Sequence, residues 1–246
     1  MRILLTNDDG IDAPGLTALF ESVQLAASHD NRPVEIIVVA PDRGRSECSH
    51  SIETSQPLRI CTVREGWTSV NGTPVDCVRV AVTAMGLEPD LVLSGVNAGA
   101  NLGVNLMISG TFAAAREASS IGIPAMAVSQ YRRHEIPRSW THVPHWLLET
   151  LIDFWNADGE QYEVGARLWN VNLPADHDDP SRIPSRVSCE IDRCPIERNG
   201  SMDPEGTVRF EWDFHGRPRE SGRDVAECFG GQITISRVSP FFDSAH

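Results

Sequence analysis

The stretch Arg2-Ile3-Leu4-Leu5-Thr6-Asn7-Asp8-Asp9-Gly10 decides the fold, because in it an apolar run ends at two adjacent carboxylates and a glycine. Such a run predicts a buried parallel strand whose carboxyl end opens into a loop, where open α/β sheets bind their ligands. Two adjacent carboxylates repel each other unless a cation lies between them, and a hard ion such as Mg²⁺ or Mn²⁺ would serve. On its own, Asn-Asp-Asp-Gly fits a solvated turn equally well.

The composition narrows the class of partner. The 246 residues are 41% hydrophobic and 22% charged, which suits one large domain or a domain with an extension. The formal net charge of -13 opposes binding to nucleic-acid polymers and to anionic membranes, so a small phosphorylated substrate would need a metal or a few arginines. The six cysteines have no zinc spacing, and no apolar run is long enough for a membrane span or a leader. We therefore expect a cytoplasmic protein with reduced thiols.

Strands and helices alternate over the first 130 residues, which predicts a doubly wound, mostly parallel sheet. Strands are predicted at 2–6, 34–40, 91–94 and 125–129, helices at 14–28, 73–86 and 111–120, and a β excursion at 52–70. Three loops follow the carboxyl ends of parallel strands, after Thr6, Ala40 and Ser94. Their residues are therefore expected to meet in one crevice.

The remainder of the chain differs in character. A helix is predicted at 139–155 and a strand at 166–173, and strand-like pieces occur near 207–214 and 231–238. We predict a core of residues 1–175. Residues 176–246 are predicted to form an extension with short β-hairpins that contacts a neighbouring subunit of a homo-oligomer.

The long Gly/Asn-rich loop after Ser94 ends in Ser109-Gly110-Thr111, at the start of a predicted helix. Backbone N–H groups and the helix dipole favour a phosphate there, and the two hydroxyls add donors. A serine before a helix is also a common N-cap, so this motif alone leaves both interpretations open. Asn97 would bring a neutral oxygen ligand to the same place.

The loop at 41–51 carries two arginines, and Arg43 or Arg45 is suited to bind a phosphate through two hydrogen bonds. A solvated basic loop is the alternative. His50 in the same loop is a candidate general acid or base, although a lone histidine is more often a packing or surface residue.

Together the three loops resemble the SurE family of stationary-phase survival proteins, which are metal-dependent nucleoside monophosphate phosphatases. Several motifs in the same order are more specific than any one of them. The resemblance is carried by Asn7-Asp8-Asp9-Gly10 with Ala13-Pro14-Gly15, Ala40-Pro41-Asp42-Arg43 with Arg45-Ser46, Gly72-Thr73-Pro74 with Asp76-Cys77, Ser94-Gly95-Val96-Asn97, Gly99 with Asn101, Ser109-Gly110-Thr111, Asn170-Val171-Asn172-Leu173-Pro174 and Asp224.

The resemblance implies a Rossmann-like, three-layer α/β core and an oligomerising C-terminal part, in a homodimer or homotetramer. It implies hydrolysis of nucleoside 5′- and 3′-monophosphates with one divalent ion, Mg²⁺ or Mn²⁺, per subunit. The implied ligands of the ion are Asp8, Asp9, Ser46 and Asn97. The expected phosphate-binding residues are Asn101, Ser109, Gly110 and Thr111, joined by Arg45.

The predicted reaction is metal-assisted hydrolysis of a phosphomonoester, in which Asp8 or Asp9 accepts a proton from the attacking water. Direct attack of a carboxylate on phosphorus remains the alternative. Haloacid-dehalogenase phosphatases use two aspartates separated by one residue, so the adjacent pair argues against that superfamily.

The chain departs from the family pattern near these loops. Glu47 stands where a glycine is usual and Glu53 where a threonine is usual, while Asn105 replaces an acidic residue and Ile108 a tyrosine. We expect these changes at the rim of the crevice, where they would alter substrate preference and rate more than the type of reaction. A carboxylate at Glu47 that faced the site would repel a phosphate or recruit another cation.

Two other classes of function stay open. One is a nucleotide-binding or regulatory protein that has kept the pocket but has weak or no turnover. The other, a dinucleotide-binding Rossmann enzyme, is disfavoured because no Gly-x-Gly-x-x-Gly follows a predicted strand. The preferred base, the physiological metal and the choice between dimer and tetramer are left to experiment.

Overall fold

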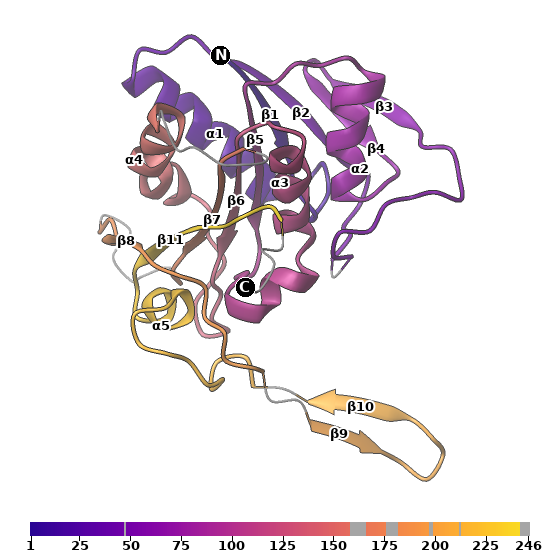
Figure 1. The fold of residues 1–246 in the computed structure, drawn as a ribbon, viewed down its shortest axis with the longest axis vertical. Coiled ribbons are helices and arrows are strands. Elements are labelled where there is room, and N and C mark those ends of the chain that lie inside the picture. Colours follow the sequence, from indigo (N-terminus) through magenta and orange to yellow (C-terminus); the bar gives the residue numbers. More distant parts are fainter. Residues whose placement is uncertain (47, 158–165, 176–181, 197–198, 212, 242–246) are drawn as a thin grey trace.

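The structure is a computed structural model that describes residues 1–46, 48–157, 166–175, 182–196, 199–211 and 213–241. Its centre is a nine-stranded sheet in the order β3-β4-β2-β1-β5-β6-β7-β11-β8 (Figure 1). The strands are β1 (Arg2–Thr6), β2 (Glu35–Pro41), β3 (Ile60–Arg64), β4 (Trp67–Val70), β5 (Leu91–Asn97), β6 (Ala125–Gln130), β7 (Leu168–Leu173), β8 (Arg186–Ser188) and β11 (Ile233–Arg237). The neighbouring strands β4, β2, β1, β5, β6 and β7 run parallel, and among the described residues of this sheet only the β3–β4 and β7–β11 pairs are antiparallel.

Helices cover both faces of this sheet, as predicted for a doubly wound fold. Figure 1 shows α1 and α4 on one side and α2 and α3 on the other. The helices are α1 (Pro14–His29), α2 (Pro74–Arg79), α3 (Gly110–Ser120), α4 (Val143–Asn156) and α5 (Asp224–Phe229), together with a π-helix, η1 (Val80–Ala84), and a 3-10 helix, η2 (Gly103–Ile108). The expected three-layer α/β architecture is confirmed.

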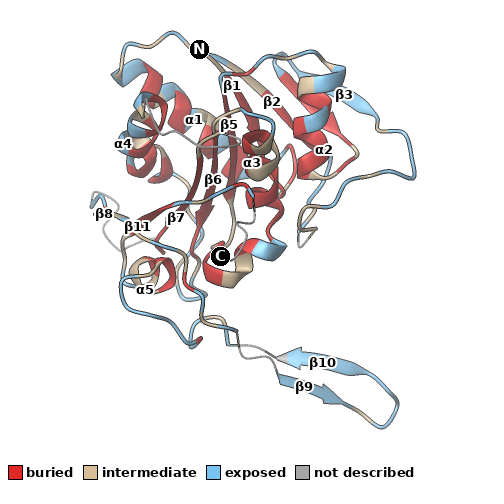
Figure 2. Cartoon of the chain, in the orientation of Figure 1, coloured by how far each residue is buried: buried red, intermediate tan, exposed pale blue. Residues whose placement is uncertain are grey.

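The central strand β1 shows why the sheet is covered on both faces. Ile3 and Leu5 are buried among side chains of α1 and α4, whereas Leu4 between them is buried among those of α2 and α3. Successive strand residues point to opposite faces, so a continuous apolar strand needs a helix layer on each side. Figure 2 shows the central strands buried along their length.

The C-terminal part contributes to the sheet and also leaves it. β11 pairs antiparallel with β7, and β8 pairs parallel with β11, so strands from both sides of residue 175 share one sheet. The expected boundary between residues 175 and 176 borders positions 176–181, which lie outside the described residues. A separate hairpin, β9 (Asn199–Met202) with β10 (Val208–Glu211), projects from the body and is exposed (Figure 2).

The local pattern predicted most helices but missed some short ones. The helix expected at 73–86 is α2 followed by η1, and α2 begins with a reciprocal cap between Thr73 and Asp76. The loop after β5 contains η2, and α5 was not expected, because both are too short to show a helical apolar period. No helix in the described ranges is long and apolar enough to cross a membrane.

Candidate active site

The two adjacent carboxylates lie in a tight turn directly after β1. The Asn7 side chain closes this turn: its Nδ2 donates to Gly10 O over 2.8 Å, and Gly10 N donates to Asn7 Oδ1 over 3.2 Å. Gly10 has a φ of 101°, which only glycine adopts without strain. The turn and the candidate site are therefore one feature, because the turn fixes the direction of Asp8 and Asp9.

Asp8 meets the first turn of α3. Thr111 Oγ1 donates a 2.5 Å hydrogen bond to Asp8 Oδ1, although 103 residues separate the two. A Cβ added to Gly110 would lie 3.1 Å from Asp8 Cβ, 3.3 Å from Asp8 Oδ2 and 2.9 Å from Cys48 Sγ. Only a glycine lets the helix terminus come this close to the carboxylate. The structure thus brings Asp8, Gly110 and Thr111 together, as the sequence predicted.

The electrostatics of Asp8 favour a cation beside it. Burial raises the pKa of the Asp8 carboxyl to about 6, and the neighbouring Asp9 also raises it, whereas the hydrogen bond from Thr111 lowers it. A buried carboxylate next to a second carboxylate is costly without a compensating positive charge. This environment fits a divalent cation, which would stabilise both ionised groups.

Asp9 and Asn97 lie where β1 and β5 end side by side. Asp9 Oδ2 accepts a 3.0 Å hydrogen bond from Ala98 N, so the carboxylate is held against the residue that follows Asn97. Asn97 Nδ2 donates to Gly99 O over 2.7 Å. This contact directs the side-chain NH₂ to the backbone, which leaves the amide oxygen as the atom suited to coordinate a cation.

The loop after β2 packs on the same turn. Arg45 N donates to Asp8 O over 2.7 Å, and Ser46 follows directly. The guanidinium of Arg45, however, donates to Asn71 O over 2.9 Å and lies 3.3 Å from Asp42 Oδ1. The backbone of Arg45 therefore helps to build the site, while its side chain is bound to Asn71 and Asp42.

Hard oxygen ligands are what the site offers. Within the described ranges, no group of three or more His, Cys, Asp and Glu side chains is placed to hold a metal. A metal ion held by the two carboxylates would therefore need the neutral oxygens of Ser46 and Asn97 as further ligands. Four oxygen ligands suit Mg²⁺ or Mn²⁺ better than a thiolate-binding metal.

Ser109 and Asn101 have structural partners. Ser109 Oγ accepts from Phe112 N over 3.0 Å and caps α3, so the N-cap interpretation of this serine holds in the structure. Asn101 Nδ2 donates to Ser129 Oγ over 2.8 Å, and its backbone N donates to Asn172 Oδ1 over 2.9 Å. The sequence analysis did not connect Asn172 with Asn101. The signal was Asn172 itself, because a polar side chain in a buried strand needs a polar partner.

The departures from the family pattern have different surroundings. Glu53 accepts hydrogen bonds from Ser55 and Gln56 and closes an exposed turn. Asn105 Oδ1 accepts from Arg217 Nη1 over 3.2 Å, and Ile108 is exposed just before α3. Glu47 lies outside the described residues.

The comparisons with known proteins agree with this geometry. A family model described as survival protein SurE matches residues 3–193. A protein of Paramagnetospirillum magneticum named 5′-nucleotidase SurE is 35% identical in an alignment covering 100% of this chain and 92% of the relative. Another of that name, from Stenotrophomonas maltophilia, is 36% identical over 97% of this chain and 89% of the relative.

The fold is also similar to that of a solved structure of a SurE protein. The crystal structure of the SurE protein from Aquifex aeolicus is similar with a TM-score of 0.78 and 25% identity, covering 99% of this chain and 95% of that one. The family match extends over the turn after β1, the loop after β2 and the start of α3. The chain belongs to the SurE family.

Proposed function

We propose that this protein is a metal-dependent phosphomonoester hydrolase that removes phosphate from nucleoside 5′-monophosphates, and also from 3′-monophosphates. The contact that carries the proposal is the 2.5 Å hydrogen bond between Thr111 Oγ1 and Asp8 Oδ1, because it joins an acidic pair to a helix N-terminus. An acidic pair suits a cation, and a helix N-terminus suits a phosphate. The relatives named 5′-nucleotidase SurE support the choice of nucleotides as substrates.

The chain's own residues divide the work in this proposal. Asp8, Asp9, Ser46 and Asn97 would hold one Mg²⁺ or Mn²⁺ ion, which when bound supplies polarisation of a phosphoryl oxygen and orientation of water. The N–H groups at Gly110 and Thr111 would bind the phosphate and the negative charge that develops on it. One of the two carboxylates would accept a proton from the attacking water. The alternative, attack of a carboxylate on phosphorus, would leave an aspartyl-phosphate intermediate.

A nucleotide-binding or regulatory protein with weak turnover is the second candidate function. The observation in its favour is Arg45, whose guanidinium donates to Asn71 O and lies beside Asp42. Bound in this way, it offers less positive charge to a phosphate than an arginine directed into the site. Tight nucleotide binding without phosphate release would identify this function.

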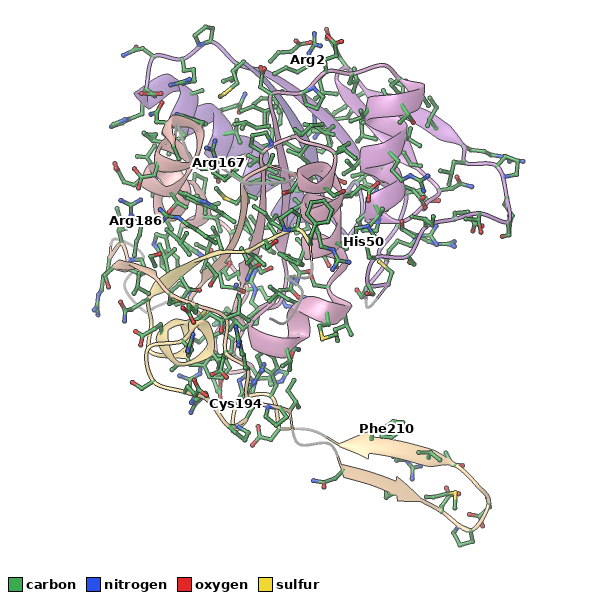
Figure 3. All side chains as sticks on the ribbon, viewed as in Figure 1. Arg2, His50, Arg167, Arg186, Cys194 and Phe210 are labelled. Carbon is green, nitrogen blue, oxygen red and sulfur yellow. The ribbon has the colours of Figure 1, made fainter. Side chains whose placement is uncertain are left out.

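We also propose that the protein is a homodimer or homotetramer in which the β9–β10 hairpin contacts a neighbouring subunit. Its support is the exposed apolar side chains of Met202, Val208 and Phe210. Figure 3 shows Phe210 on the hairpin, which projects from the body. A two-stranded hairpin is marginally stable alone, and a partner surface would stabilise it.

The test of the proposed activity is phosphate release from a panel of nucleoside 5′- and 3′-monophosphates and an aryl phosphate, with Mg²⁺, with Mn²⁺ and with a chelator. Metal-dependent release that favours nucleotides is the expected result. Release that persists in chelator would contradict the metal requirement. Nucleotide binding without release under either metal would select the second candidate.

A further inference from the structure

His50 makes contacts with two neighbouring residues of α3. His50 Nε2 lies 2.9 Å from Glu117 Oε2, and Arg116 Nε donates to His50 Nδ1 over 3.2 Å. Glu117 also faces Arg79 of α2, with 3.9 Å between Oε1 and Nε. The side chains of His50 and Glu117 are 27% and 18% exposed, so both contacts are partly shielded from water.

One tautomer of the imidazole satisfies both contacts. Arg116 can only donate, so Nδ1 of His50 must accept, and a neutral imidazole with an acceptor at Nδ1 carries its proton at Nε2. That proton points to the carboxylate of Glu117. The arrangement therefore uses both ring nitrogens of His50 and leaves neither free for proton transfer to a substrate in this position.

The loop that carries Ser46 is held on both sides of this serine, and His50 follows directly after the second anchoring point. At one end Arg45 N donates to Asp8 O over 2.7 Å, and at the other Ser49 N donates to Ile108 O over 3.1 Å. Ser49 Oγ also donates to Met107 O over 2.7 Å. Ser46, which supplies one of the proposed ligands, lies between these two ends. Figure 3 shows His50 beside α3.

Helix α3 contacts both Asp8 and His50. The first turn of this helix contacts Asp8 through Thr111, and six residues later Glu117 contacts His50. The carboxylate of Asp8 and the loop that carries Ser46 and His50 are thus both positioned relative to the same helix. Loss of the His50 contacts would remove the bonds between α3 and the loop that carries Ser46, while the backbone bonds of Arg45 and Ser49 and the contact between Asp8 and Thr111 would remain.

We propose that His50 is a positioning residue that fixes Ser46 relative to Asp8 by binding Arg116 and Glu117 of α3. This inference rests on the proposed function, because it takes Ser46 to be a ligand of the divalent ion. It excludes a role for His50 as the general acid or base. The histidine acts through the loop, and its removal should weaken metal binding without removing a catalytic group.

The first test is backbone amide exchange of the protein in chelator. In His50→Ala the amides of Ser49 and Ser51 should exchange about tenfold faster, the effect expected from losing a hydrogen bond to a charged group. The amide of Ile11, which donates to Pro41 O, is the internal reference. His145→Ala, at an exposed histidine of α4, is the matched control and should change none of these amides.

The second test is Mn²⁺ affinity followed by kinetics. His50→Ala should raise the Kd of Mn²⁺ about three- to tenfold, and its kcat should return to within about twofold of wild type at saturating Mn²⁺. His50→Gln keeps a donor for Glu117 and should recover part of the affinity. Glu117→Ala should match His50→Ala, and the double variant should be no worse than either single one.

The outcomes separate this inference from the proposed function. Unchanged exchange and unchanged Mn²⁺ affinity in His50→Ala would overturn the positioning role, and so would a kcat that stays low at saturating Mn²⁺ with normal affinity. A wild type that binds Mn²⁺ but releases no phosphate would overturn the hydrolase, whereas the exchange and affinity results would still decide the role of His50. A wild type that binds no Mn²⁺ would overturn both.

Discussion

Thr111 Oγ1 donates a 2.5 Å hydrogen bond to Asp8 Oδ1, and this bond joins the end of the central strand to the first turn of α3. The strand end supplies negative charge, whereas the helix terminus presents N–H groups and a positive dipole. A cation and a phosphate can therefore be bound next to each other. The bond also lowers the pKa of Asp8, against the larger effect of burial.

Asp8→Asn should remove metal-dependent phosphate release while leaving the fold intact. Asparagine keeps the shape of the side chain and an oxygen that can accept from Thr111, but it lacks the negative charge that holds the cation. We expect kcat/KM to fall about 10²- to 10³-fold, measured with Mg²⁺ and Mn²⁺. Asp12→Asn, at an exposed position nearby, is the control. Full activity of the Asp8 variant would refute the site assignment.

Wild type and Asp8→Asn should also differ in how their stability depends on pH when no metal is bound. Burial raises the pKa of Asp8 to about 6 in the folded protein, above its usual value of 3.8, so this group favours folding below pH 4 and loses that contribution as pH rises through 6. In chelator, the unfolding free energy of Asp8→Asn minus that of wild type should be roughly 2 kcal/mol larger at pH 7 than at pH 4. Urea unfolding at the two pH values measures this difference, and saturating Mg²⁺ should reduce it. A gap that does not change with pH would contradict the burial effect.

Gly110→Ala should disturb the contact between α3 and Asp8. The new methyl group would lie 3.3 Å from Asp8 Oδ2 and 2.9 Å from Cys48 Sγ, so the helix terminus or these two side chains must shift. A displacement of this kind should lower kcat/KM about 10²-fold. Gly44→Ala is a suitable control, because its methyl would meet only Asp9 O, at an ordinary 3.6 Å. Equal activity of the two variants would show that the close approach is not required.

The sequence predicted the sheet and the site loops because their signals are local. The apolar run that ends at Asp8 and the Ser-Gly-Thr before a helical pattern each lie within a few residues, and parallel topology then brings them to one edge. What the sequence could not show is which partner a side chain finds. Binding of a phosphate by Arg45 stays a prediction, and the hydrogen bond from its guanidinium to Asn71 O is a contact set by tertiary packing that no local pattern shows. The partners of His50 were invisible for the same reason.

Asn172→Ala should lower stability more than a surface substitution. Asn172 Oδ1 accepts from the buried Asn101 N over 2.9 Å, and alanine would leave that N–H without its partner. The unfolding free energy should fall by about 2–3 kcal/mol, measured in urea. Asn199→Ala, on the exposed strand β9, should stay near wild type. A similarly small loss at Asn172 would mean that water replaces the lost bond.

Phe210→Ser tests whether the β9–β10 hairpin contacts a neighbouring subunit. Phe210 is 76% exposed in the single chain, and a large aromatic side chain on a projecting hairpin is the kind of group that anchors an interface. We expect the variant to shift the assembly towards monomer at micromolar concentration, measured by size-exclusion chromatography with light scattering. Ile183→Ser removes an exposed apolar side chain outside the hairpin and should leave the assembly unchanged. If the Phe210 variant and wild type have the same mass, the subunit contact lies elsewhere. Phosphate release by a monomeric variant would further show that each subunit holds a complete site.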